Sequence, residues 1–217
     1  MNVTKYIHSC LLIEKEGRRL LIDPGSFSFL DESLTLEMIG AVDAILITHK
    51  HADHFDAGIL KQFLVMNDRT KIVTIDEIGV ELTKESINFE RIDDGEIRDV
   101  AGFFVEAFRS PHGELPVPLP DNIGYLIDST LFHSGDSYEP NRQVKCSVLA
   151  LPVAGPWSRL VDAVAMIDRV RPSIVLPIHD AIIKDFMLER MYGMVEKQCE
   201  TFGARFVRMP TGVSFEC

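Results

Sequence analysis

Short apolar runs alternate with longer amphipathic stretches along the chain, and this pattern predicts strands and helices in alternation. The apolar runs are bounded by glycine, proline and other turn residues, as is typical of strands in a packed sheet. The strands are expected over residues 4–13, 18–22, 44–47, 71–75, 103–108, 124–127, 131–133, 148–151, 174–176, 205–207 and 213–215. The first two are expected to be joined by a turn at Gly17.

Three stretches repeat apolar residues every three or four positions, which predicts amphipathic helices. These stretches are residues 57–66, 158–170 and 185–202. Asp56 stands where the first helix needs an N-cap, and Gly203 stands where the last helix ends. Pro172 follows the end of the middle helix, as expected of a residue that cannot continue one.

The order of these elements predicts the fold class. Both halves of the chain run through strands first and then through strand–helix units. This order is typical of an α/β protein in which two sheets pack on each other with helices outside, a four-layer αββα sandwich. A chain of 217 residues is long enough for one sizeable core, and we expect a single domain over residues 1–217.

Composition agrees with a folded domain and argues against two classes of partner. Hydrophobic residues make up 46% of the chain and charged residues 25%, which is ordinary for a globular domain. The formal net charge of −11 is a poor electrostatic match to nucleic acid, whose binding proteins usually present a basic face. No run of about 18 apolar residues is present, so we expect no membrane partner.

The beginning of the chain and its cysteines indicate a cytoplasmic protein. Residues 1–9 lack the basic flank and the long apolar run of a signal peptide. Cys10, Cys146, Cys199 and Cys217 are scattered and form no C-x-x-C pair, so we expect reduced thiols.

The strongest chemical signal is the run His49-Lys50-His51-Ala52-Asp53-His54, which directly follows an apolar strand. At strand-like spacing the side chains of His49 and His51 point the same way and can share one metal ion. Asp53 and His54 come after the chain turns and can serve a second ion. Imidazole suits zinc, iron and copper, and carboxylate adds manganese. The alternative interpretation is a polar loop whose histidines are incidental.

Three further candidate ligands each follow a predicted strand. These are His112 in Ser110-Pro111-His112-Gly113, Asp136 in His133-Ser134-Gly135-Asp136, and His179 in Leu176-Pro177-Ile178-His179. Any one of them alone is more often a turn residue or a structural histidine. Functional sites in α/β architectures lie at the C-terminal ends of strands, so their shared placement favours a common site.

The run from His49 to His54 resembles the H-x-H-x-D-H motif of the metallo-β-lactamase superfamily. His112, Asp136 and His179 match the remaining ligand positions of that superfamily in order, and the turn Asp23-Pro24-Gly25 resembles the aspartate-bearing turn that precedes the motif. The resemblance covers essentially the whole chain.

Within the superfamily the chain is most similar to small single-domain hydrolases related to ascorbate-6-phosphate lactonase. The supporting residues are His8-Ser9, Phe132-His133-Ser134-Gly135-Asp136, and Leu151-Pro152-Val153 with Asp162-Ala163 after it. The chain departs from those relatives at Ala154-Gly155-Pro156-Trp157, where they often carry a glycine-rich stretch.

The resemblance implies a binuclear hydrolase with a defined set of ligands. One metal ion is assigned to His49, His51 and His112, the other to Asp53, His54 and His179, and Asp136 bridges both. Zinc is the preferred assignment, with manganese and iron as alternatives. A hydroxide between the ions attacks the substrate, and Asp53 also orients this nucleophile or shuttles a proton. The centre keeps about one net positive charge by ligand count, which favours a small anionic substrate or an oxyanion transition state.

Some other polar and aromatic residues are expected to support the ligands, and for others the sequence leaves two roles possible. Asp23 and Thr48 are expected to hydrogen-bond to the ligand histidines. His133 is interpreted as a packed, hydrogen-bonded core histidine. His8, Trp157 and Tyr138 either line the site or pack in its walls, and Asp180 and Glu114 have the pattern of solvated loop residues.

The bond that is hydrolysed stays open at this point. Esters or lactones and phosphodiesters of small molecules fit the same residues. A catalytically inactive metal-binding module of the same fold is an alternative, as is a metal-dependent redox enzyme. The redox relatives carry glutamate at the position of His51 and an additional flavin domain. A homo-oligomer, in which a second subunit completes the pocket, is a hypothesis.

Overall fold

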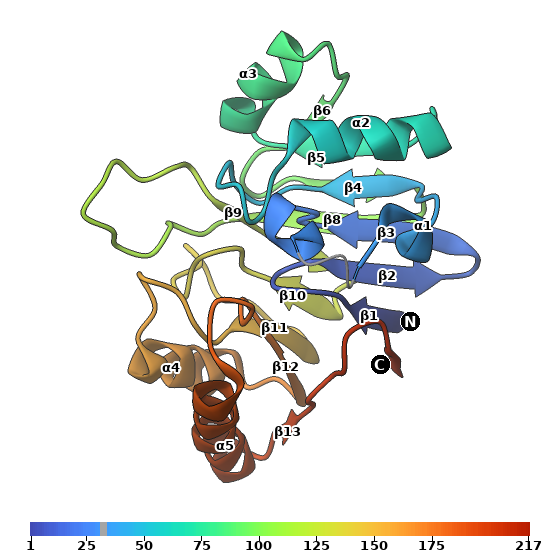
Figure 1. Cartoon of the computed structure of the whole chain (residues 1–217). Helices are drawn as coiled ribbons and strands as arrows, with labels where there is room; N and C mark the ends of the chain where they lie inside the picture. The colour runs from blue at the N-terminus through green and yellow to red at the C-terminus, as the bar shows by residue number, and fades with distance from the viewer. Residues whose placement is uncertain (31–33) are drawn as a thin grey trace.

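The computed structural model describes residues 1–30 and 34–217, which form two seven-stranded sheets packed face to face (Figure 1). The first sheet contains β14 (Ser214–Glu216), β1 (Asn2–Lys5), β2 (Leu11–Lys15), β3 (Arg18–Ile22), β4 (Ala44–Leu46), β5 (Lys71–Thr74) and β6 (Glu90–Arg91), in that order. Neighbouring strands from β14 to β3 are antiparallel, and those from β3 to β6 are parallel.

The second sheet repeats this arrangement. It contains β7 (Ile97–Val100), β8 (Phe103–Arg109), β9 (Ile123–Ile127), β10 (Leu131–His133), β11 (Val148–Pro152), β12 (Ile174–Ile178) and β13 (Arg205–Phe206), in that order. Strands β7 to β10 pair antiparallel and β10 to β13 pair parallel. In both sheets the parallel strands follow the antiparallel ones, as the order of elements predicts.

Helices cover the outer face of each sheet (Figure 1). On the first sheet these are α1 (Leu36–Ile39), α2 (Ala57–Met66) and α3 (Asp76–Lys84), and on the second they are α4 (Leu160–Val170) and α5 (Asp185–Phe202). A short 3-10 helix, η1 (Ser26–Phe29), follows β3. The four-layer αββα sandwich predicted from the sequence is therefore confirmed.

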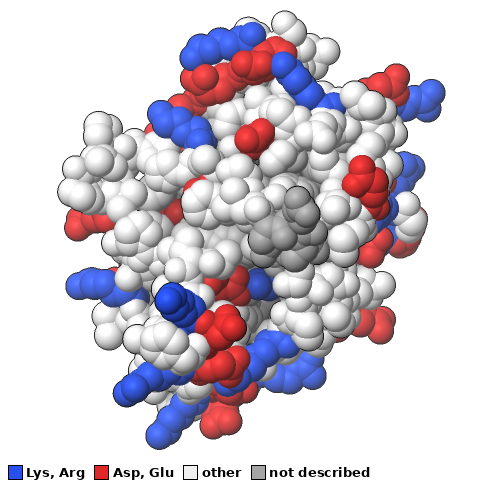
Figure 2. Space-filling view, viewed as in Figure 1, with Lys and Arg blue, Asp and Glu red and all other residues white. Residues whose placement is uncertain are grey.

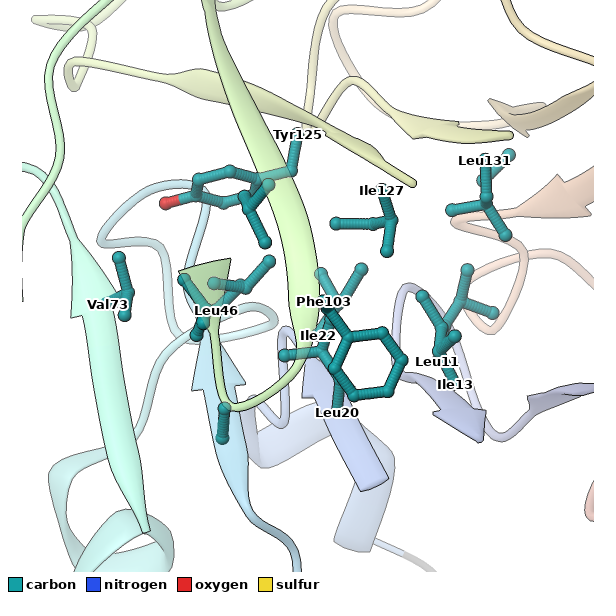
Figure 3. Close-up of a cluster of buried hydrophobic side chains, with 14 of the residues drawn as sticks. Leu11, Ile13, Leu20, Ile22, Leu46, Val73, Phe103, Tyr125, Ile127 and Leu131 are labelled. Carbon is teal, nitrogen blue, oxygen red and sulfur yellow. The ribbon is translucent and has the colours of Figure 1, made fainter. Parts of the chain in front are cut away.

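The inner faces of the two sheets meet in one cluster of buried side chains (Figure 3). Leu20 and Ile22 of β3 point into this cluster, whereas Leu21 between them packs under the helices outside. Phe103 and Ile127 face them from the second sheet. The two-residue alternation of a strand thus assigns successive side chains to two different cores, which is why the strands are apolar throughout.

Tyr125 links the two sheets beside the predicted site. Its ring is fully buried in the inner cluster, and its hydroxyl donates a hydrogen bond of 2.8 Å to the carbonyl of Ile47. Burial raises the pKa of Tyr125 well above its ordinary value, so the hydroxyl keeps its proton. Ile47 is two residues before His49, and this bond therefore anchors the backbone from which the histidine motif starts.

The single strand predicted over residues 4–13 is wrong. The chain forms β1 and β2 with a tight turn between them, in which Tyr6 N–H donates to the carbonyl of Cys10 at 2.9 Å. His8, within the turn, has a φ of 64°, and a regular strand cannot contain such a left-handed residue. The apolar residues on both sides of His8-Ser9 hide this turn in the hydrophobic pattern.

Several short elements escape the sequence pattern. Helices α1 and α3 and strands β6 and β7 were not predicted, and the helix expected from residue 158 begins at Leu160. Helix α3 buries only one side, through Ile78, Gly79 and Leu82, so its apolar signal is weak. None of the helices in the described ranges is both long and apolar enough to cross a bilayer.

Two helical glycines allow a test of the packing of α3. A methyl group added at Gly79 would lie 2.2 Å from the ring of Phe89, whereas one added at Gly193 in α5 would meet no atom within 4 Å. We expect Gly79→Ala to lower the free energy of unfolding by about 1–3 kcal/mol through overpacking. We expect Gly193→Ala to raise it by about 0.5–1 kcal/mol because alanine is the better helix former. Urea unfolding of both variants checks this, and equal effects would contradict the packing of α3.

Candidate metal centre

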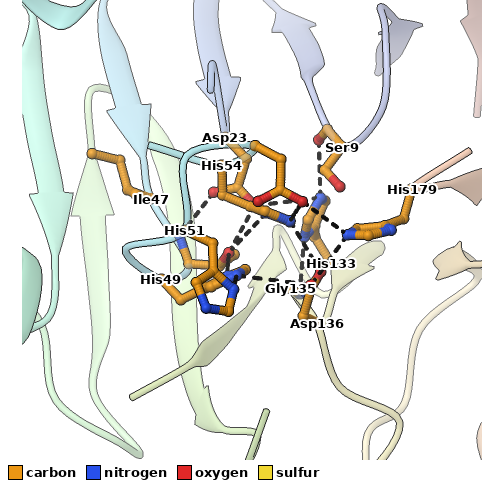
Figure 4. Close-up of polar contacts among 12 residues, drawn as sticks. Ser9, Asp23, Ile47, His49, His51, His54, His133, Gly135, Asp136 and His179 are labelled. Carbon is orange, nitrogen blue, oxygen red and sulfur yellow. Dashed lines mark hydrogen bonds and ion pairs between the residues drawn. The ribbon is translucent and has the colours of Figure 1, made fainter. Parts of the chain in front are cut away.

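All the predicted ligands follow the C-terminal ends of strands, and both sheets bring these ends to one edge (Figure 4). The motif residues follow β4 in the first sheet. His112 follows β8, Asp136 follows β10 and His179 follows β12 in the second sheet. The site therefore forms only when the two halves of the chain pack against each other.

One group of side chains comprises three histidines and a carboxylate. His51 Nδ1 lies 3.1 Å from His49 Nε2 and 3.2 Å from His112 Nε2. The carboxylate of Asp136 lies 3.8 Å from His49 Nε2 and 3.5 Å from His112 Nε2. One ligand atom from each of the four residues falls within 4.8 Å of all the others. This is the set assigned to the first metal ion, together with the predicted bridge.

A second group lies beside the first. Asp53 Oδ2 is 3.7 Å from His54 Nε2 and 3.3 Å from His179 Nε2. His8 joins them, with its Nε2 atom 3.1 Å from the same oxygen of Asp53. Ligand atoms of these four residues also lie within 4.8 Å of one another. The three residues predicted for the second metal ion are thus together, and His8 is an addition.

The carboxylate of Asp136 reaches both groups. Its Oδ1 atom lies 3.0 Å from His54 Nε2, and its Oδ2 atom lies 3.1 Å from His179 Nε2 as well as near His49 and His112. The side chain is 3% exposed. A buried carboxylate between two sets of imidazoles has the placement expected of a ligand that bridges two metal ions.

Orphaned polar atoms show that these residues fit metal ions. His54 Nε2, His179 Nε2 and Asp136 Oδ1 are buried, and although they lie close to other polar atoms they form no hydrogen bond of acceptable geometry in the described part of the chain. Buried polar atoms are nearly always paired, and leaving one unpaired costs about 1–3 kcal/mol. Imidazole nitrogens and carboxylate oxygens at this spacing suit zinc, manganese or iron. The structure brings all seven predicted ligands together, and their coordination of metal ions stays a prediction.

Comparison with known proteins identifies the family. The family described as beta-lactamase superfamily domain matches residues 2–179, which include all seven candidate ligands. The chain belongs to the metallo-β-lactamase superfamily. It is 32% identical to the protein Rv0786c of Mycobacterium tuberculosis over 209 residues, which cover 93% of this chain and 94% of that protein.

Two further relatives agree with the family and the fold. A UPF0173 metal-dependent hydrolase of Nanoarchaeum equitans is 29% identical over 191 residues, 81% of this chain and 82% of its own. The metallo hydrolase Igni18 of Ignicoccus hospitalis superposes with a TM-score of 0.74 at 22% identity, covering 100% of this chain and 98% of that one. The likeness to ascorbate-6-phosphate lactonase stays a resemblance.

Asp23 and Thr48 orient two histidines of this superfamily site. Asp23, fully buried, accepts hydrogen bonds from Thr48 N–H at 2.8 Å and from the Thr48 hydroxyl at 2.7 Å. His54 Nδ1 donates to the same carboxylate at 2.7 Å, and His49 Nδ1 lies 3.0 Å from the Thr48 hydroxyl. With Nδ1 engaged in this way, both imidazoles direct Nε2 into the cluster, where a neutral ring would offer its lone pair to a metal ion. These are the contacts predicted for Asp23 and Thr48.

The turn that carries Asp23 packs tightly against the motif. A methyl group added at Gly25 would lie 2.1 Å from the backbone carbonyl carbon of Asp53. Only glycine allows the two backbones to approach this closely. The Asp23-Pro24-Gly25 turn therefore sets the position of Asp53 and His54 by contact as well as by hydrogen bonding.

The charges of the cluster shift the pKa values of its histidines in opposite directions. Burial, together with His54, holds the pKa of His49 well below its ordinary value. Burial also acts to lower the pKa of His179, but the carboxylates of Asp136 and Asp53 outweigh it and raise this pKa to about 9. The pKa of His54 is raised well above its ordinary value by Asp136 and Asp23, against the effect of burial. Bound metal ions would replace these protons as partners of the carboxylates.

His8 has a hydrogen-bonding pattern that separates it from the ligands. The backbone N–H of Ala181 donates to its Nδ1 atom at 3.3 Å, and burial lowers its pKa, so the ring is neutral with its proton on Nε2. That Nε2–H donates to Asp53 Oδ2. His8 therefore holds the carboxylate of Asp53 in place. The sequence left its role open, and the only signal was a polar His8-Ser9 pair inside an apolar run.

Trp157 lies against the carboxylate of Asp136. Its indole Nε1–H donates to Asp136 Oδ2 at 2.8 Å, and a methyl group on Gly113 would lie 2.2 Å from its ring. Tyr138 packs on the indole with ring centroids 5.1 Å apart, and its hydroxyl donates to the carbonyl of Pro152. Trp157 thus lines the site, whereas Tyr138 packs behind it.

The other residues left open by the sequence lie outside the cluster. His133 is fully buried, accepts a hydrogen bond from Gly135 N–H and lies 3.2 Å from the carbonyl of Ser9, which confirms a structural role. Asp180 is not solvated as predicted, because it is buried in an ion pair of 2.7 Å with Lys5. Glu114 is exposed.

Replacement of His8 tests its role beside Asp53. We expect His8→Asn to weaken the binding of one of two metal ions by about 10–100-fold and to leave the affinity for the other unchanged, because only one group contains Asp53. Asparagine tolerates the left-handed backbone at this position but is too short to reach the carboxylate. Chelator competition against zinc or manganese gives the two affinities. His8→Gln, which keeps a donor near the position of Nε2, should restore part of the loss, and equal affinities in all three proteins would contradict the assignment.

Proposed function

We propose that this protein is a binuclear metal-dependent hydrolase that acts on an ester, lactone or phosphodiester of a small molecule. The observation that carries the proposal is the buried carboxylate of Asp136, which lies between two complete sets of imidazole and carboxylate groups. The name of the Nanoarchaeum equitans relative, a metal-dependent hydrolase, supports the same reaction class.

In this proposal the ligand residues are assigned to two metal ions. His49, His51 and His112 would hold one divalent ion, Asp53, His54 and His179 the other, and Asp136 both. Two such ions would supply hydroxide at neutral pH and stabilise the negative charge that develops on the attacked group. Zinc is our preferred assignment, and manganese and iron suit the same donors.

Asp53 differs from Asp136 in its access to the substrate. Its side chain is 17% exposed, against 3% for Asp136, and it lines the adjacent pocket. His8 and His179 contact its Oδ2 atom and keep it in a single orientation. We assign Asp53 the task of orienting the attacking group and receiving its proton, because it is the more exposed of the two carboxylates that line the pocket.

The size of the pocket supports a small substrate. A pocket of about 640 Å³ opens over His51, Asp53, Asp136 and His179. This volume lies within the range that is typical of sites for small molecules and cofactors. A folded macromolecule would have to present a single protruding group to reach the cluster.

Loss of the bridging carboxylate tests the proposal. We expect the purified protein to bind two divalent ions and to hydrolyse members of a panel of esters, lactones and phosphodiesters. Chelation should abolish this activity and added zinc or manganese should restore it. Asp136→Asn should lower kcat by more than about 100-fold. Replacing a residue that hydrogen-bonds to a metal ligand typically lowers activity by about 10–100-fold, and replacing the ligand itself should lower it further. Metal analysis and steady-state kinetics measure both effects.

The matched control is Asp68→Asn, because Asp68 is an exposed aspartate outside the site. It should keep the metal content and kcat of the parent protein. A metal-loaded parent protein that hydrolyses no member of the panel would overturn the proposal and favour the inactive metal-binding module.

A further inference from the structure

The pocket over the candidate metal centre has apolar walls. Its floor is formed by the candidate ligands His51, Asp53, Asp136 and His179. The rest of the lining, apart from Gly155, consists of Phe27, Leu115, Pro156, Trp157, Ile182 and Ile183. Lysine and arginine are absent from this described lining. The polar groups of the pocket are therefore concentrated at one end, where the reaction would occur.

Part of the wall comes from loops that carry candidate ligands, and part lies beside a positioning residue. Leu115 follows His112 by three residues, and Ile182 follows His179 by three. Phe27 lies in η1, and its ring is 5.7 Å from that of His8. Because Leu115, Ile182 and Phe27 each lie near a candidate ligand or a positioning residue, this part of the wall keeps a fixed position relative to the cluster.

The loop that contributes Leu115 extends the apolar surface outwards. Its prolines stiffen the backbone, and Val117 and Leu119 are 56% and 44% exposed. In Figure 2 this loop, at the left of the view, forms mainly uncharged surface, whereas basic and acidic groups intermingle at the margins. A substrate that is longer than the pocket would thus continue along apolar side chains.

A charged substituent would find no partner among the wall residues that the structure describes. Arg159, near the other side of Trp157, is paired with Asp162 at 2.7 Å. Moving a charge from water into an apolar pocket without a partner is strongly unfavourable. Burying an alkyl chain there is favourable, at about two- to fourfold in binding for each methylene group. The lining therefore selects against a charged substituent on the substrate and for a hydrocarbon group.

We propose that the substrate is an uncharged carboxylic ester or lactone whose acyl part is an alkyl or aryl group held by these walls. The inference rests on the proposed hydrolase function and narrows it. Water adds across the acyl C–O bond: the acyl carbon gains the hydroxyl group, and the leaving oxygen gains the proton. The positive charge of the centre then serves the oxygen of the attacked carbonyl, and the anionic substrate expected from the sequence is not needed.

The test compares acyl groups that leave the same alcohol. The metal-loaded protein is assayed with p-nitrophenyl acetate, butyrate and hexanoate, with mono-p-nitrophenyl succinate, and with bis-p-nitrophenyl phosphate. The succinate ester matches the butyrate ester in length but ends in a carboxylate. We expect kcat/KM to rise about two- to fourfold per methylene. We expect the succinate ester to react at least about tenfold more slowly than butyrate.

A charge placed in the wall should reverse this preference. Ile182 is 45% exposed, so Ile182→Lys should fold, and its ammonium group should bring the succinate ester to the level of butyrate or above it. The matched control is Ile97→Lys on β7, where the isoleucine is 67% exposed and far from the pocket lining. This variant should keep the preference of the parent protein.

The outcomes separate the substrate class from the hydrolase function. Faster reaction of the succinate ester or of the phosphodiester in the parent protein would overturn the apolar substrate and leave the hydrolase standing. If no compound is hydrolysed, the proposed function fails, and calorimetric binding of acetate, butyrate and hexanoate to the metal-loaded protein still decides the inference. Affinity that rises with chain length supports it, and equal affinities overturn it.

Discussion

The carboxylate of Asp136 imposes the constraint on which the centre depends. It is buried between histidines from both halves of the chain, where a negative charge is stable only beside compensating positive charge. That charge comes either from protons on His54 and His179, whose pKa values are raised, or from metal ions. The same carboxylate also accepts a hydrogen bond from the indole N–H of Trp157, so Asp136 and the pocket wall are held together.

The fold supplies this arrangement by bringing the ends of strands from two sheets to one edge. Neither sheet carries a complete set of ligands, because the motif follows β4 and the other candidates follow strands of the second sheet. Tyr125 joins the sheets through the carbonyl of Ile47, and Gly25 lets the Asp23 turn touch the backbone of Asp53. Packing in the core therefore sets the distances between the candidate ligands. A change in either contact would shift the backbone that carries the histidine motif and would move its side chains.

The sequence predicted the fold and the clustering of the candidate ligands because both depend on regular patterns. His49 and His51 stand out by strand spacing, whereas Asp136 and His179 gained weight only from their places after strands and from the resemblance. The role of His8 was not predictable, since it depends on a left-handed turn and on a donor, Ala181, that is distant in the chain. Asp180 was misinterpreted for the same reason: its partner, Lys5, lies 175 positions away.

Apart from Trp157, the apolar wall residues could not be predicted from the sequence, since an isoleucine in a loop has no periodicity to mark it. The position of the wall residues lets different side chains meet two requirements of a hydrolase, which are to hold the metal ligands and to select the substrate. The ligands need a polar and tightly bonded backbone, whereas selection among substrates needs only side chains that face the pocket. Leu115 and Ile182 stand three positions from His112 and His179, far enough to change without moving the ligand beside them. A superfamily built in this way can keep one chemistry and vary its substrates through the walls, because function is specified by the site rather than by the fold.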